Sequence, residues 1–108
     1  MSREGSKFNE TNVYRVRRTS RLNEGIFLSK LILKKHRDVQ IEGMGECISL
    51  VCKLGQILSK NGLATITNIR EENIDREGRR EINPKITLCL KASNNFDKLT
   101  EGLVLKKD

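Results

Sequence analysis

Four arginines that lie close together near the start of the chain have the chemistry needed to bind phosphate groups. Arg15 and Arg17 alternate along a segment with the pattern of a strand, and they fall on the same face of it. Arg18 and Arg21 follow in the polar turn that comes next. Because a guanidinium group presents a planar fork of donors that matches phosphate oxygens, the spacing predicts one ridge of phosphate ligands. The alternative is an ordinary solvated basic surface.

Other basic side chains fall into two further groups. Lys34 and Lys35 lie in the last turn of the first predicted helix and are also candidate phosphate ligands. Arg76, Arg79 and Arg80 lie in a charge-dense segment that is too long for a tight hairpin turn. We expect this segment to form a flexible arm whose arginines contact a groove or the backbone of a nucleic acid.

The distribution of charge favours a polyanionic partner. The 108 residues include 21 lysines and arginines against 14 acidic residues, which gives a formal net charge of +7. Between residues 7 and 37 nine basic residues face only two acidic ones, so this part of the chain holds the whole surplus. Aromatic residues make up only 4% of the chain and tryptophan is absent, so we expect affinity to come from phosphate contacts and not from base stacking.

A pair of glycines, Gly43 and Gly45, stands where a strand passes into a helix. A dinucleotide fingerprint would need a third glycine at position 48, where the chain has isoleucine. It would also follow the first strand, whereas these glycines follow the second predicted strand. A P-loop would need a lysine at position 46, where the chain has Glu46. The glycines are therefore interpreted as a tight turn, with backbone contact to a phosphate as the alternative.

Catalytic and metal-binding patterns are weak. The chain has three cysteines and one histidine, and Cys47 and Cys52 would point about 140° apart on a helix. His36 lies among basic residues with no nucleophile pattern nearby. We therefore predict no enzyme, no metal and no cofactor. No apolar run approaches the roughly 20 residues of a membrane span, and the odd number of thiols indicates a reducing interior, so we expect an intracellular protein of nucleus and cytoplasm.

Hydrophobic periodicity predicts an α/β domain with the order βαβαββ. Two right-handed crossovers place both helices on one face of a mixed four-stranded sheet, in the strand order 1-2-4-3. We expect Asn23 to cap the first helix. The predicted strands are 12–18, 38–43, 63–69 and 85–92, the first helix is 22–37 and the second follows Gly45. Around this domain, residues 12–92, we expect a flexible basic lead at 1–11 and a tail at 93–108.

These features together resemble the Alba family over residues 12–92. The resemblance lies in the element order, the basic turn "VRRTSRLNEG" after the first strand, the turn "IEGMGECIS", and an arginine-bearing arm before the last strand. A family motif close to I-x-A-x-G-x-A-I-S leads the second helix, and its places are taken here by Ile41, Gly43, Gly45, Cys47, Ile48 and Ser49.

The resemblance implies a small DNA- and RNA-binding protein of low sequence specificity, acting in chromatin organisation or in RNA and translation regulation. It also implies a homodimer, or a heterodimer with a related Alba protein. Because the family has relatives among protein subunits of ribonuclease P and MRP, a subunit of such an RNA-processing particle is the alternative. A second alternative is a protein-interaction module whose basic face meets an acidic partner or a membrane.

One helix face offers a surface for dimerisation. Small or slim side chains at Ile48, Cys52 and Gly55 lie beside the buried stripe of the second predicted helix. The alternative is that these residues pack against the chain's own tail, for which three leucines are available: Leu99, Leu103 and Leu105.

Overall fold

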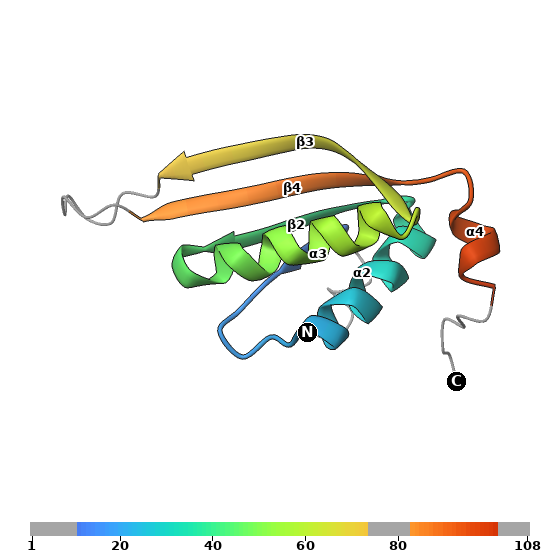
Figure 1. Ribbon diagram of the computed structural model, residues 1–108. Coiled ribbons are helices and arrows are strands. Elements are labelled where there is room, and N and C mark those ends of the chain that lie inside the picture. The colour runs from blue at the N-terminus through green and yellow to red at the C-terminus, as the bar shows by residue number, and fades with distance from the viewer. Residues whose placement is uncertain (1–10, 74–82, 102–108) are drawn as a thin grey trace, which may run out of the picture.

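The computed structural model describes residues 11–73 and 83–101, and in it two long helices pack against one sheet (Figure 1). In chain order the elements are β1 (Val13–Arg15), α2 (Leu22–His36), β2 (Asp38–Met44), a single 3-10 turn η1 (Gly45–Cys47), α3 (Ile48–Lys60), β3 (Ala64–Asn73), β4 (Pro84–Ala92) and α4 (Phe96–Leu99). The strands lie in the order β1-β2-β4-β3, with β1 parallel to β2 and β4 antiparallel to both of its neighbours. The predicted mixed sheet and two-layer α/β architecture are confirmed.

The core lies between one face of the sheet and the two long helices. Alternation in the strands turns Val39 and Ile41 of β2 and Leu88 of β4 toward the helices, where each is almost completely buried. Val51 and Leu54 of α3 meet them from the other side. The remaining buried apolar side chains are Tyr14, Val16, Ile32, Leu33, Leu58, Leu63, Ala64, Leu90 and Phe96.

Two glycines let α3 lie close against the sheet. A Cβ atom at Gly43 would lie 2.7 Å from Cγ2 of Val51, and one at Gly55 would overlap Cδ1 of Leu88. Two expectations were therefore wrong: Gly43 belongs to β2 and not to the turn, and Gly55 faces the sheet and not a partner. The turn is made by Gly45, whose φ of +56° favours glycine.

Several element ends differ from those expected. Arg21 occupies the N-cap of α2 without a side-chain capping bond, and Asn23 lies inside the helix. β1 ends at Arg15, earlier than expected, because the chain then turns toward α2. β3 and β4 are longer than expected, since pairing continues to Asn73 and Pro84. The middle of the predicted arm lies outside the described residues.

The segment after β4 contributes to the core through an aromatic side chain. Phe96 is completely buried, whereas Leu99, one of the leucines expected to dock, is 53% exposed. Arg37 holds this segment from outside: its guanidinium donates to both Asp97 carboxylate oxygens, at 2.9 and 3.2 Å, and lies 5.5 Å from the centre of the Phe96 ring. Leu103 and Leu105 lie outside the described residues.

Candidate nucleic-acid interface

The four arginines predicted to bind phosphate project from the end of β1 and from the connection to α2, and we name them the arginine ridge: Arg15, Arg17, Arg18 and Arg21. The strand orients Arg15, because its neighbours Tyr14 and Val16 are buried on the helix side and leave Arg15 on the opposite face, whereas Arg17 lies beyond the end of β1. All four residues of the ridge are exposed.

A compact turn shapes the rest of the ridge. The backbone N–H of Ser20 donates to the carbonyl oxygen of Arg17 at 3.0 Å. In return, the backbone N–H of Arg17 donates to Oγ of Ser20 at 2.9 Å. The two bonds close a turn whose central residues, Arg18 and Thr19, stand out in solvent.

One carboxylate joins the ridge to the base of the β3–β4 hairpin. Glu42 Oε2 lies 2.7 Å from Nε of Arg15, and its other oxygen lies 3.3 Å from Nζ of Lys85. The side chain of Glu42 is only 11% exposed. Burial alone would raise the pKa of this carboxyl, but hydrogen bonds from Arg15 and Lys85 outweigh burial and leave the pKa below its usual value. Both cations are therefore held in position by a carboxylate that stays ionised.

A second carboxylate pairs with the ridge at the surface. Arg18 Nε lies 2.6 Å from Oε2 of Glu46, but both side chains are largely exposed, at 79% and 66%. An exposed pair of this kind is worth only about 0.2–1 kcal/mol and is weakened by salt. Arg18 can therefore exchange Glu46 for a phosphate at small cost.

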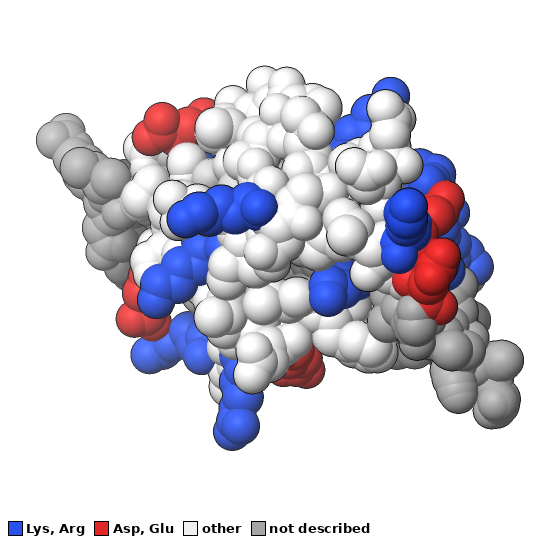
Figure 2. All heavy atoms as spheres, turned by 45° about the vertical axis from the view of Figure 1, so that its right-hand side comes forward, with Lys and Arg blue, Asp and Glu red and all other residues white. Residues whose placement is uncertain are grey.

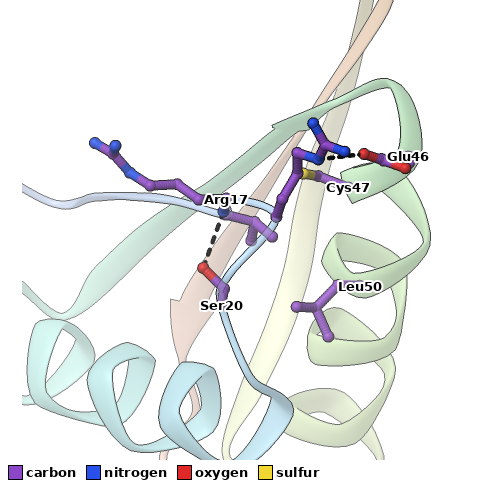
Figure 3. Close-up of a pocket in the computed structure, with 7 residues that line it drawn as sticks. Arg17, Ser20, Glu46, Cys47 and Leu50 are labelled. Carbon is purple, nitrogen blue, oxygen red and sulfur yellow. Dashed lines mark hydrogen bonds and ion pairs between the residues drawn. The ribbon is translucent and has the colours of Figure 1, made fainter.

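A hollow of about 320 Å³, the ridge hollow, lies between the turn and the start of α3 (Figure 3). Arg17 and Ser20 approach it from the turn, while Glu46 and Leu50 approach from the other side. The remaining lining residues are Val16, Arg18 and Cys47. The ridge hollow therefore combines an apolar wall with the ion pair of Arg18 and Glu46, while the side chain of Arg17 extends away from Glu46 and Leu50 (Figure 3).

Comparisons with known proteins agree with this architecture. Neither a protein-family model nor a curated protein sequence matches the chain. Among solved structures, the crystal structure of ALBA1 from Trypanosoma brucei superposes with a TM-score of 0.74 at 17% identity, over 84% of this chain and 77% of that one. Alba from Thermoplasma volcanium superposes with a TM-score of 0.64 at 16% identity, over 74% of this chain and 99% of that one. The chain has an Alba-like fold. The fold expected from the resemblance is thus confirmed.

The Alba-like fold separates two of the predicted phosphate ligands from the others. Lys34 and Lys35 lie in the last turn of α2, whereas the ridge precedes its first turn. A helix of 15 residues is about 22 Å long, so the two groups cannot meet the same phosphate. Figure 2, in which the right-hand side of Figure 1 is turned forward, shows basic side chains spaced around a broad uncharged area. The ridge is the denser cluster of the two.

The Alba-like hairpin places the root of the predicted arm beside the ridge. Arg76, Arg79 and Arg80 lie outside the described residues. Pro84 and Lys85 begin β4 at the end of the sheet where β2 passes into the turn; Lys85 lies opposite Met44, and its side chain reaches Glu42. Of the two glycines proposed as possible phosphate contacts, Gly45 is exposed at this end and Gly43 is buried within β2.

Sequence reasoning missed two basic residues of the open sheet face. Lys85 reaches Glu42, and Arg70 donates to Oε1 of Gln40 at 3.2 Å and approaches Sγ of Cys89 at 3.5 Å. The alternation of β4 had placed Lys85 on the face away from the core, and that signal was available. Arg70 was missed because the length of β3 depends on its pairing with β4.

Within the described parts of the chain, no group of three or more histidine, cysteine or acidic side chains is arranged to hold a metal ion. Over residues 11–73 and 83–101, no helix has the length and apolar character needed to cross a membrane. Cys47, Cys52 and Cys89 are all free thiols.

Proposed function

We propose that this chain binds DNA or RNA through the phosphate backbone, with little dependence on base sequence. The observation that carries the proposal is the arginine ridge: four exposed guanidinium groups on one strand end and its turn, next to the root of the β3–β4 hairpin. The Alba-like fold supports it, since the family resemblance implies nucleic-acid binding. Chromatin organisation, or RNA and translation regulation in nucleus and cytoplasm, would use binding of this kind.

The ridge would bind by replacing counterions around the phosphates. Arg17 and Arg21 have exposed side chains, and Arg18 has a carboxylate partner that a phosphate can displace. If about five phosphates are contacted, log K for duplex DNA should fall with log salt at a slope of roughly −4 to −5, and less steeply for single strands. A slope shallower than about −2 in gel-shift titrations would remove the ridge as the main contact surface.

We further propose that the chain acts as a homodimer, or as a heterodimer with a related Alba protein. One ridge is short, and once it is bound, the ridge of a second subunit would meet the same nucleic acid at an effective concentration of about 1 mM. Cys52 is exposed on α3, and Ile48 beside it is partly exposed, so both remain accessible to a partner. Light scattering on the full chain measures the oligomeric state. A chain that is monomeric at the concentrations at which it binds duplex DNA would contradict the proposed dimer.

A pair of matched variants tests the site itself. Arg17→Glu with Arg18→Glu and Lys34→Glu with Lys35→Glu change the net charge equally, at opposite ends of α2. Losing two phosphate contacts should weaken binding by about 60-fold at about 0.1 M salt, so the ridge variant should bind far more weakly than the helix-end variant. Equal losses in both variants would show that general charge, and not the ridge, determines binding.

Crosslinking in cells separates this proposal from its two rivals. A general binder should be recovered with many nucleic-acid sequences. Recovery of one large structured RNA would instead support a subunit of a ribonuclease P or MRP-like particle. A purified chain that fails to bind DNA and RNA at low salt would favour a protein-interaction module.

A further inference from the structure

The turn that carries the ridge also contains the pattern of a phosphorylation site. Ser20 has Arg17 three residues before it and Arg18 two residues before it, and no other serine or threonine of the chain has arginine at both positions. One class of serine kinases selects this pattern, because acidic pockets in the kinase bind the two guanidinium groups. We propose that Ser20 is a phosphorylation site and that the phosphate weakens nucleic-acid binding by the ridge. The second half of this inference rests on the proposed function.

The structure makes the site accessible to a kinase. Ser20 lies half-buried in the connection between β1 and α2, and Arg17, Arg18 and Thr19 around it are exposed. The turn is closed by two hydrogen bonds, at 3.0 and 2.9 Å, and both join Arg17 to Ser20. Kinases bind an acceptor segment in extended form, so the turn must open. Each bond contributes only about 1 kcal/mol net, and opening disrupts no other described hydrogen bond of the acceptor serine.

The reaction is a phosphoryl transfer from ATP. Oγ of Ser20 attacks the γ-phosphorus, the new O–P bond forms, and the bond from that phosphorus to the bridging oxygen breaks. ADP leaves with the bonding electron pair, and the hydroxyl proton passes to the catalytic base of the kinase. The product carries a charge of about −1.5 to −2 at pH 7.

The position of the new phosphate determines its effect. Ser20 lines the ridge hollow together with Arg17 and Arg18, and its Oγ accepts from the backbone N–H of Arg17, so a phosphate on Oγ would lie in the turn that carries these two arginines (Figure 3). It would compete with Glu46 for Arg18, and it would repel an incoming nucleic-acid phosphate. Its charge offsets about two of the four guanidinium groups. The arginine ridge, which is proposed to bind phosphates of a nucleic acid, would then carry a covalently attached phosphate beside it.

The size of the effect follows from counterion release. If two fewer phosphates are neutralised, the slope of log K against log salt becomes shallower by about 1.8. At about 0.1 M salt this corresponds to about 60-fold weaker binding, and the loss should become smaller as salt is raised.

The experiment incubates the purified full chain with ATP and a serine kinase selective for arginine at the second and third positions before the acceptor. Intact mass and fragment spectra locate the phosphate. We expect one phosphoryl group on Ser20 in the wild type and in Thr19→Ala, and none in Ser20→Ala. Phosphate on Thr19, or none on the wild type, would overturn the site. Thermal unfolding of each variant verifies that the substituted chains fold.

Binding to duplex DNA is then measured before and after the kinase step. Phosphorylated wild type should bind about 60-fold more weakly, and phosphatase treatment should restore binding. Because Ser20→Ala also removes the hydroxyl that accepts from Arg17, this variant is compared with itself, and kinase treatment should leave its affinity unchanged. Unchanged affinity of the phosphorylated wild type would overturn the regulation. If the unmodified chain does not bind at all, the proposed function fails, while the mass spectra still decide the phosphorylation site.

Discussion

Replacing Glu46 by glutamine removes the carboxylate that lies 2.6 Å from Arg18 and keeps the shape of the side chain. In the unbound chain this carboxylate competes with any phosphate that approaches Arg18. Because the two side chains are 79% and 66% exposed, the pair belongs to the exposed class, worth about 0.2–1 kcal/mol. Loss of this competition should therefore raise the affinity for nucleic acid by about 1.4-fold to 5-fold.

Fluorescence anisotropy with one labelled duplex, at several salt concentrations, measures this change. Glu101→Gln is the matched control, because it changes the net charge equally and lies beyond α4, at the far end of α2 from the ridge. The gain in Glu46→Gln should exceed that of the control and should fall as salt rises, since salt screens the pair. Equal gains in the two variants, or no gain in Glu46→Gln at low salt, would refute the idea that Glu46 occupies part of the ridge.

Three further predictions concern stability and are measured by denaturant unfolding. Because the pKa of Glu42 is lowered by folding, its ion pairs stabilise the fold fully above the carboxyl's unfolded pKa, and this contribution is lost as the pH falls through the lower folded pKa. Glu42→Gln should therefore lower the free energy of unfolding by about 1–3 kcal/mol at pH 7. The difference from wild type should be smaller well below about pH 4.3. Gly55→Ala should destabilise the chain by about 1–3 kcal/mol, because its Cβ overlaps the buried Leu88; a loss as small as that of an exposed Ser59→Ala control would contradict the close contact. Phe96→Ala should cost about 3–5 kcal/mol, whereas Leu99→Ala should cost much less, and similar values would show that α4 does not anchor the core through Phe96.

Local patterns were sufficient to predict the sheet and both long helices. Alternation marked β4 to within one residue. The handedness of crossovers placed both helices on one face, and the strand order followed from the simplest pairing of the fourth strand, antiparallel to the third and beside the second. The elements themselves are each specified within a short stretch of the chain, and their order in the sheet depends only on how they are connected.

The features that were missed depend on residues far apart in the sequence. The end of β3 is rich in charge and was assigned to the arm, but pairing with β4 extends it to Asn73. Phe96 stands alone among polar residues, so no period marked it as a core residue. The ion pair between Arg15 and Glu42 requires the β1–β2 register, which places the two residues directly opposite each other. A single sequence does not fix that register.

Burial distinguishes the roles of the two carboxylates beside the ridge. Glu42 is 11% exposed and holds two cations, so removing it would leave Arg15 and Lys85 without the group that positions them. Glu46 is 66% exposed and holds one cation loosely. A phosphate would therefore find Arg15 already oriented, whereas it must displace a carboxylate to reach Arg18. It follows that Glu42→Gln, although it removes the same charge as Glu46→Gln, should give the smaller gain in affinity, because the disorder of the released side chains opposes the gain in net charge.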